Sequence, residues 1–278
     1  ADHASQVSGM GLEGTGQFAS YSIQRDCEIS EDGSLIQFGN DFTLSGTYPN
    51  VRLQVTQQAY QLDIQLSVHD NVTWFSDLPF YQHIGLMADY QGHIQHDGKR
   101  TAVSGHCTYE YARLVSPYGL QNGLRQGLFK RFLKKPLPMA MRMPLDFFTY
   151  QIVHIDDDTQ LMLAKVGGFG AACVETAWIR RRGQPSASLA KNTRFEVVEF
   201  EASPRTAPDG NPMRLPQHFR WVVNDGDTNI ATINGTVDTP MTYGLCRGYV
   251  GGYHYQGEFN GKPINGRAYI EYVDVSHF

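Results

Sequence analysis

The sequence predicts an all-β protein made of two antiparallel β-domains in tandem. Strand-like stretches recur about every ten residues along both halves of the 278-residue chain, with Asp, Asn and Gly between them. The hydrophobic period within these stretches is two, which is typical of a half-buried strand. A hairpin motif near position 100 is repeated near position 265, and such a repeat indicates two copies of one domain.

Composition supports a folded protein and excludes several functional classes. Hydrophobic residues make up 41% of the chain and charged residues 18%, which is a globular balance. The formal net charge of −5 argues against nucleic-acid binding, which needs a clustered positive field. No apolar run reaches the roughly 18 residues that span a bilayer. The N-terminal stretch lacks the regions of an intact signal peptide, so we expect a cytoplasmic protein, with a secreted protein whose signal was removed as the alternative.

The first half of the chain holds the clearest strand pattern. In 59–68 every second residue is apolar: Tyr60, Leu62, Ile64, Leu66 and Val68. The segment 51–55 is its expected hairpin partner. The sequence His-Asp-Gly-Lys at 96–99 predicts a tight turn between two further strands. Other strands are expected over 34–46, 83–94 and 101–113.

The second half shows the same pattern of strands and turns after a basic stretch. Its expected strands cover 147–155, 160–166, 173–181, 193–202, 218–225, 229–237, 244–259 and 266–275. We therefore predict an N-terminal domain over 1–122, a linker with a short helix over 123–146, and a C-terminal domain over 147–278.

The linker has helical spacing of apolar residues and many basic ones. Pro136 is expected to end its helix. In one interpretation the apolar residues pack on a barrel while Lys and Arg face water. In the other, 124–135 is a basic amphipathic segment that touches an anionic membrane surface.

The repeated hairpin motif closes each half. It consists of Tyr-Gln-Gly in a strand, a Gly-Lys turn, and a strand carrying Gly-x-x-x-x-Glu-Tyr: Tyr90, Gln91, Gly92, Gly98, Lys99, Gly105 and Glu110 in the first copy, and Tyr255, Gln256, Gly257, Gly261, Lys262, Gly266 and Glu271 in the second. Six positions separate Gly92 from Gly98 but four separate Gly257 from Gly261, so we expect turns of different length.

Strand alternation sorts each motif into two faces. Glu110 shares a face with His106 and Thr108, whereas Cys107, Tyr109 and Tyr111 should face a core. In the second copy Glu271 shares a face with Arg267 and Tyr269, and Ala268, Ile270 and Tyr272 should face a core.

Two interpretations of the motif glutamates stay open. In the first, each glutamate is a structural group that pairs with a strand neighbour, for which Arg267 is a candidate. Alternatively, one is a carboxylic acid in a barrel mouth whose pKa is raised by apolar walls, so that it acts as a proton donor.

Further site candidates come from aromatic stretches that contain acids and histidines. Among the catalytic candidates, Glu110 or Asp89 is the expected general acid, and His83 and Tyr81 are expected to orient the substrate. A buried core histidine is the alternative for His83. The substrate-binding candidates are Trp74, Phe75, Trp178, His218, Trp221, Tyr243, Arg247, Tyr253 and Glu271. Aromatic residues in strands also serve as ordinary core residues.

Several kinds of site lack their sequence signals. There is no HExxH, Walker A or GxSxG motif, and the four cysteines form no CxxC pair, so we expect neither a metal nor a cofactor. We expect Cys27, Cys107, Cys173 and Cys246 to be free thiols, with disulfides as the alternative.

Three segments carry a resemblance to a known family: "HIGLMADYQG" (83–92), "SGHCTYEYAR" (104–113) and "YHYQGEFNGKPINGRAYIEYVD" (253–274). With the pattern Gly-x-Pro-x-x-Gly-x-x-Tyr-x-Glu from Gly261 to Glu271, the chain resembles the AttH and carotenoid 1,2-hydratase (CrtC)-like group of lipocalin-like proteins. The resemblance implies two lipocalin-like β-barrel domains. It also implies hydration, isomerisation, dehydration or cyclisation of hydrophobic olefins without a cofactor.

We therefore expect a cofactor-independent hydratase, isomerase or cyclase that acts on a hydrophobic olefin such as a terpenoid, steroid or polyketide. One or two proton-transfer groups in an apolar site would perform the chemistry. Two alternatives are a non-catalytic carrier of a hydrophobic metabolite and a structural module that docks another protein.

Overall fold

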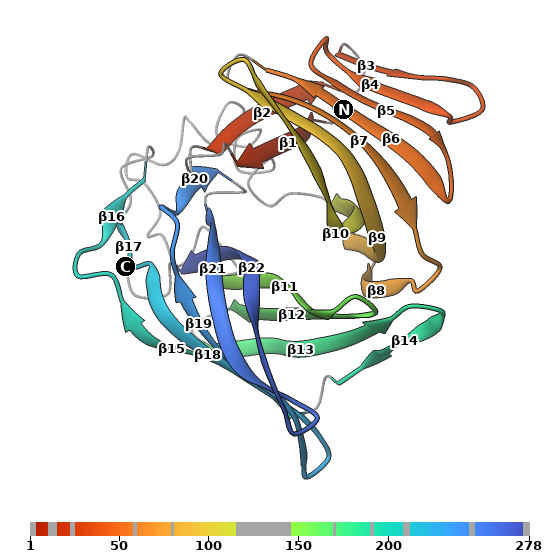
Figure 1. Ribbon diagram of the computed structural model, residues 1–278. Coiled ribbons are helices and arrows are strands. Elements are labelled where there is room, and N and C mark those ends of the chain that lie inside the picture. Colours follow the sequence, from red (N-terminus) through yellow and green to blue (C-terminus); the bar gives the residue numbers. More distant parts are fainter. Residues whose placement is uncertain are drawn as a thin grey trace, which may run out of the picture.

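The computed structural model of the chain describes residues 4–10, 16–22, 26–57, 60–78, 81–114, 146–168, 171–189, 192–207, 212–244 and 248–274. The predicted all-β class is confirmed, because the described residues form curled antiparallel sheets of the lipocalin-like kind (Figure 1). The predicted helical linker, 123–146, lies outside the described residues except for Asp146. No helix in the described ranges is long and apolar enough to cross a membrane.

The first large sheet comes from the first half of the chain. Its strands, in the described ranges, are β3 (Cys27–Ile29), β4 (Leu35–Phe38), β5 (Phe42–Thr47), β6 (Asn50–Thr56), β7 (Tyr60–Val68), β8 (Thr73–Leu78), β9 (Tyr81–His96) and β10 (Lys99–Leu114). The spatial order is β10-β9-β7-β6-β5-β4-β3, and β8 also pairs with β9. A separate hairpin joins β1 (Ala4–Met10) to β2 (Gly16–Ser22). The predicted pairing of 51–55 with 59–68 is confirmed as the pair β6 and β7.

The second large sheet comes from the second half. Its strands are β11 (Phe147–Asp156), β12 (Thr159–Gly168), β13 (Ala171–Arg181), β14 (Gln184–Ser188), β15 (Asn192–Phe200), β18 (Pro216–Asp225), β19 (Thr228–Val237), β20 (Thr242–Gly244), β21 (Gly248–Phe259) and β22 (Lys262–Asp274). The order is β14-β13-β12-β11-β22-β21-β19-β18-β15, with β20 on β21. A short pair, β16 (Arg205–Thr206) and β17 (Pro212–Met213), stands apart.

Each large sheet buries its own apolar core. The first core is small and includes Val51, Leu66 and Leu86. The second is larger and surrounds Trp221 and Tyr253, both without exposed surface. A third apolar cluster lies where the two sheets meet, with Tyr150, Met162 and Ala164 buried in it and Phe75, Phe148, Ile152 and Trp178 packed around them.

The two motif hairpins are β9–β10 and β21–β22, and their turns are the same. Asp97 and Gly98 have φ values of 49° and 75°, and Asn260 and Gly261 have 50° and 71°. Two consecutive positive φ values are typical of a two-residue type I′ turn. The expectation of turns of different length is therefore wrong. The extra length lies in the strands, where β9 and β10 have 16 residues each against 12 and 13 in β21 and β22.

The extra residues preserve the faces of the hairpin. From the turn glycine, Gly92 and Gly105 lie six and seven positions away, whereas Gly257 and Gly266 lie four and five positions away. Each arm of the first hairpin is thus longer by two residues. Because side chains alternate with a period of two, a two-residue extension keeps every side chain on its original face.

Packing explains the Tyr and Gly residues of the motif. Tyr90 pairs with Gly105 and Tyr255 with Gly266, and each ring covers its glycine so closely that a Cβ there would lie 3.2 Å and 2.8 Å from the phenol oxygen. At Gly92 and Gly257 a Cβ would overlap the backbone oxygen of Asp63 and of Thr232. These positions need glycine in both copies because the neighbouring group occupies the space of a side chain.

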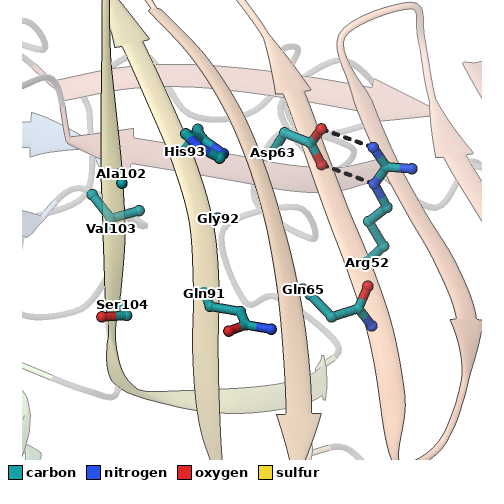
Figure 2. A pocket seen from close by; sticks show the side chains of 9 residues that line it. All are labelled: Arg52, Asp63, Gln65, Gln91, Gly92, His93, Ala102, Val103 and Ser104. Atoms are coloured by element: carbon teal, nitrogen blue, oxygen red, sulfur yellow. Dashed lines mark hydrogen bonds and ion pairs between the residues drawn. The ribbon is translucent and has the colours of Figure 1, made fainter.

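The motif glutamines have a different place. Gln91 and Gln256 are exposed, and each lies in a polar row that crosses four strands: Arg52, Gln65, Gln91 and Ser104 in the first sheet, and Arg220, Asn234, Gln256 and Asn265 in the second. Each row lines an open polar groove, and Figure 2 shows the first one with the Arg52–Asp63 ion pair at one side.

Candidate active site between the two sheets

The face of β10 that carries Glu110 meets the second sheet. Thr108 Oγ1 donates to Gln160 Oε1 at 3.2 Å, and the Tyr150 hydroxyl donates a hydrogen bond to Glu110 Oε1. The predicted sharing of this face by His106, Thr108 and Glu110 is therefore confirmed. On the opposite face, Cys107 and Tyr109 pack on the first core as predicted.

Tyr111 departs from that prediction, because 57% of it is exposed. Its strand partner is Ile84, which is only a partly buried residue at the margin of the first core. The apolar core thus ends before the strand does. In the second copy, Ala268, Ile270 and Tyr272 all pack in or on the second core, as predicted.

The two motif glutamates converge on one group of side chains. Tyr150 in β11 lies directly beside Glu271 in β22, and its hydroxyl reaches Glu110 from the other sheet. The Tyr269 hydroxyl donates to Glu271 Oε1 at 2.9 Å. With His83 and Arg180, these residues form what we call the carboxyl cluster: His83, Glu110, Tyr150, Arg180, Tyr269 and Glu271.

The proton affinity of Glu271 is strongly altered. Burial raises the pKa of Glu271 from its ordinary 4.5 to about 8, and the nearby charge of Glu110 acts in the same direction, against the Tyr269 hydrogen bond. Burial also raises the pKa of Tyr150 and of Tyr269 well above the usual range. At neutral pH, Glu271 therefore holds a proton, and both phenols remain donors.

Glu110 has a different environment within the same cluster. Its side chain is 27% exposed, and Arg180 Nη2 lies 4.0 Å from Oε1. His83 Nε2 lies 3.4 Å from Oε2, and the His83 ring packs edge-on against Phe75 with centroids 5.3 Å apart. Arg267 was the expected structural partner of Glu271 in the second copy. It forms its ion pair with Asp238 instead, at 2.9 Å.

Arg180 reaches across the interface from β13. It is 1% exposed, and its Nε donates to Thr73 Oγ1 at 2.8 Å while Nη1 donates to Gln160 Oε1 at 2.7 Å. The guanidinium lies over Gly85, where a Cβ would stand 2.5 Å from Nη2. A glycine at this point of β9 therefore makes room for the arginine.

Aromatic and aliphatic side chains border the carboxyl cluster on one side. Tyr150 belongs to the third apolar cluster, together with two predicted substrate-binding residues, Phe75 and Trp178. Phe75 packs edge-on against Tyr150, with ring centroids 6.0 Å apart. Ionisable groups thus lie next to a cluster of apolar side chains.

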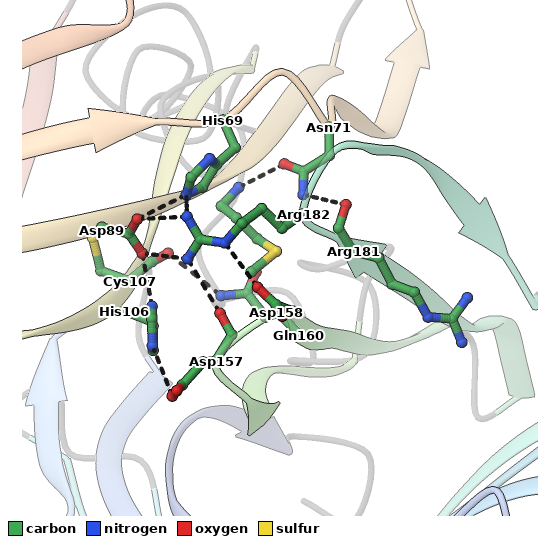
Figure 3. Close-up of polar contacts among 11 residues, drawn as sticks. His69, Asn71, Asp89, His106, Cys107, Asp157, Asp158, Gln160, Arg181 and Arg182 are labelled. Atoms are coloured by element: carbon green, nitrogen blue, oxygen red, sulfur yellow. Dashed lines mark hydrogen bonds and ion pairs between the residues drawn. The ribbon is translucent and has the colours of Figure 1, made fainter.

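Asp89 lies in a separate ion-pair network at the same interface (Figure 3). Arg182 Nη1 lies 2.8 Å from Asp89 Oδ2, His106 Nδ1 lies 2.8 Å from Oδ1, and His69 Nε2 lies 3.1 Å from Oδ2. The Arg182 hydrogen bonds hold the pKa of Asp89 well below its usual range. This carboxylate joins the sheets and is poorly suited to donate a proton.

The other predicted site residues lie elsewhere. Trp221 and Tyr253 are core residues, and Tyr243 packs against Tyr249 at the margin of that core. Trp74 is 48% exposed, and His218 Nδ1 lies 3.0 Å from Thr236 Oγ1. Arg247 and the side chain of Tyr81 lie outside the described residues.

Sequence reasoning missed Arg180, Tyr150 and Tyr269 as site residues. Arg180, Arg181 and Arg182 follow one another where β13 ends, and three successive charges directly after Trp178 and Ile179 are an unusual end for a strand. That pattern could have marked them as cross-interface partners. Tyr150 and Tyr269 carried no such signal.

The described cysteines form no disulfide. Cys27 and Cys107 are free thiols, as expected, and the side chains of Cys173 and Cys246 lie outside the described residues. In the part of the chain that the structure describes, no group of three or more His, Cys, Asp and Glu side chains is placed to hold a metal ion.

A family model matches residues 1–277. The chain belongs to DUF6670, a family of unknown function. No curated protein matches the sequence.

A crystal structure of a protein assigned as an AttH from Nitrosomonas europaea is similar, with a TM-score of 0.63 and 12% identity over 94% of this chain and 78% of that one. The crystal structure of kievitone hydratase from Nectria haematococca is also similar, with a TM-score of 0.62 and 13% sequence identity. That match covers 98% of this chain and 81% of the hydratase chain. At these identities the likeness is one of fold, and the resemblance to AttH-like proteins is confirmed at that level.

Proposed function

We propose that this protein is a cofactor-independent hydratase-type enzyme that adds water to, or removes it from, a carbon–carbon double bond of a hydrophobic molecule. One observation carries the proposal. Two carboxyl groups, one from each sheet, share a cluster in which Glu271 keeps a proton at neutral pH beside Glu110. Paired groups with separated proton affinities are the usual arrangement of an acid and a base. The fold shared with a hydratase supports the same class of reaction.

The roles follow from the surroundings of each glutamate. Glu271 donates its proton to one alkene carbon, and this forms the new C–H bond. Glu110 accepts a proton from a water molecule, whose oxygen forms the new C–O bond at the other carbon. The sum is one water added, and the reverse sequence removes it. The Tyr150 hydroxyl binds Glu110, and Tyr150 is the strand neighbour of Glu271, so it is our candidate for returning the proton from Glu110 to Glu271.

Apolar side chains beside the cluster would hold the body of the substrate. Phe75 and Trp178 present rings next to Tyr150, and aromatic faces stabilise positive charge that develops on carbon. Terpenoids, steroids and polyketides combine an apolar skeleton with isolated double bonds. Isomerisation or cyclisation of such a molecule would use the same proton donation without the addition of water.

Mass spectrometry in D₂O tests the proposal. The protein is incubated with a panel of olefinic terpenoids, steroids and polyketides, beside Glu110→Gln, Glu271→Gln and the control Glu258→Gln, which alters an exposed residue of β21. We expect addition of D₂O, or deuterium uptake, with the parent and the control, and its loss with both cluster variants. Compounds that bind but leave unchanged would contradict the proposal and favour a carrier of hydrophobic metabolites.

A further inference from the structure

We infer that Arg180 is the positioning residue that assigns the two proton-transfer roles: its guanidinium lies as a counter-charge beside Glu110, the proposed proton acceptor, and among the described residues it makes no ion pair with Glu271, the proposed donor. The catalytic part of this inference rests on the proposed function. The effect of Arg180 on the two carboxyl groups does not, because it exists without substrate.

Arg180 is a permanent charge in a buried place. A guanidinium is not deprotonated in proteins, and a buried charge needs a compensating partner. Among the described residues, Glu110 is the one carboxylate within 4.0 Å of this 1% exposed side chain. Its other hydrogen-bond partners, Thr73, Thr108 and Gln160, are uncharged. The charge of Arg180 is therefore compensated by Glu110 alone in the described part of the chain.

The position of the guanidinium is fixed by three hydrogen bonds. Nε and Nη1 are held by Thr73 of β8, Thr108 of β10 and Gln160 of β12. Nη2 is thereby left as the nitrogen that faces Glu110. Gly85 leaves the space that this nitrogen occupies. Both the anchoring and the gap therefore direct one arm of Arg180 toward one glutamate.

The remaining groups around the pair do not make the same distinction. His83 of β9 contacts Glu110, Tyr150 of β11 donates to Glu110 and is the strand neighbour of Glu271, and Tyr269 of β22 donates to Glu271. Phenols donate hydrogen bonds without carrying a compensating charge. His154 of β11 contacts Gln160, which binds Arg180, and burial lowers the pKa of His154 to about 4, so it stays neutral near pH 7. Arg180 is the permanent cation among them.

The pair of Arg180 and Glu110 forms across the contact between the two sheets. Arg180 belongs to the second sheet and Glu110 to the first. Glu110 meets its counter-ion only when the two sheets are packed together. The acid and the base are thus distinguished in the assembled molecule and not in either half.

Titration of the carboxyl groups by ¹³C NMR tests this directly, without substrate. The glutamate carboxyl signals are assigned with Glu110→Gln and Glu271→Gln, and then followed with pH in the parent, Arg180→Met and Arg180→Lys. In the parent we expect two well-separated steps, one for each carboxyl. In Arg180→Met the steps should approach each other by about one to three pH units, and each signal should show both steps, because an opposite charge at this distance shifts a carboxyl by that amount.

Controls separate this role from a merely structural one. Arg180→Lys keeps the charge and should restore much of the separation. Arg182→Met removes the arginine that binds Asp89 at the same interface, and the two steps should stay apart. If Arg180→Met does not fold, Gly85→Ala serves instead, because its methyl group would stand 2.5 Å from Nη2 and 3.1 Å from Glu110 Oε1 and would push the guanidinium away from the carboxylate.

Each outcome decides the matter. Unchanged, separate steps in a folded Arg180→Met or Gly85→Ala protein would overturn the inference, and so would merged steps in Arg182→Met. If the titration behaves as expected but no olefin is converted, Arg180 still assigns the proton and the proposed function fails alone.

Discussion

The hairpins β9–β10 and β21–β22 carry the same motif but place it in different surroundings. In Figure 1 the β9–β10 turn lies at the top and the β21–β22 turn towards the bottom. Far from both turns, Tyr150 joins the glutamates, since it pairs with Glu271 and donates to Glu110. β10 ends the first sheet and pairs only with β9 among the described strands, whereas β22 lies between β11 and β21. Glu110 on the outer strand is part exposed and faces Arg180, whereas Glu271 on the inner strand is part buried and binds the Tyr269 hydroxyl.

The difference shows how one sequence motif can supply two chemical roles. The Tyr and Gly residues make the same packing contacts in both copies, so the hairpin itself is a structural unit. The glutamate comes at the same distance from the last motif glycine each time. Strand position and partner charges then decide which glutamate binds its proton more tightly.

The largest expected effect concerns turnover. Once a substrate is known, Glu110→Gln and Glu271→Gln should each lower kcat by about 10²- to 10⁴-fold, the usual contribution of a general acid or base. Their pH profiles should differ. The parent rate should fall above a pH of about 8 as Glu271 loses its proton, and Glu271→Gln should lack that limb. Equal rates for the parent and either variant would remove that glutamate from the mechanism.

The next effect concerns stability and pH. The folded pKa of Glu271 is about 8 and its unfolded value about 4.5, so the folded state binds the extra proton between these limits. Its stabilising contribution is full below pH 4.5 and is lost as the pH rises to 8, by on the order of 4 kcal/mol. Urea unfolding of Glu271→Gln should lack this decrease, whereas Glu110→Gln should retain most of it. A decrease of the same size in Glu271→Gln would contradict the assignment.

A third effect tests the packing that both hairpins share. Gly257→Ala and Gly92→Ala each force a methyl group into a backbone oxygen, and we expect a loss of about 3 kcal/mol for each. Thermal unfolding should show midpoints about 6 to 12 °C lower. Gly98→Ala is a suitable comparison, since no atom lies within 4 Å of a Cβ there and only the positive φ opposes the change. Equal losses at Gly257 and Gly98 would mean that close approach is not the reason for the glycine.

The smallest effect separates the two motif tyrosines. The Tyr255 hydroxyl donates to the backbone oxygen of His154, so Tyr255→Phe should cost about 1 kcal/mol. The ring of Tyr90 covers Gly105 in the same way, but no hydrogen bond of its hydroxyl to a described residue accompanies it, so Tyr90→Phe should change the free energy of unfolding by under about 0.5 kcal/mol. Paired chemical denaturation curves measure both, and the reverse order would contradict this comparison.

Much of the fold could be predicted from the sequence because strand alternation is a local signal. It placed Glu110 with Thr108 and Glu271 with Tyr269, and it placed Ile270 and Tyr272 in a core. The same rule fails at Tyr111, because alternation does not say where a core ends. It also cannot tell a turn extension from a strand extension, and the two-residue lengthening of β9 and β10 was therefore misread.

The composition of the site was less accessible from the sequence. Glu110, Glu271, His83, Phe75 and Trp178 are brought to one interface, but the partner that distinguishes the glutamates, Arg180, is a long-range contact from another sheet. Trp221 and Tyr253 are residue types that are common in binding sites, but both are fully buried in the second core. Residue type alone does not separate these two uses of an aromatic side chain.

The meeting of the two glutamates across the sheets has a consequence for symmetry. Two copies of a single half, arranged as a homodimer about a twofold axis, would present two identical carboxyls in identical surroundings. Such a pair can differ in protonation only through mutual repulsion, and either member would hold the proton equally often. With both halves in one chain, a substitution such as an arginine at position 180 alters one side alone. Because both halves belong to one chain, the two carboxyl groups can have different surroundings, and one of them can hold the proton in preference to the other.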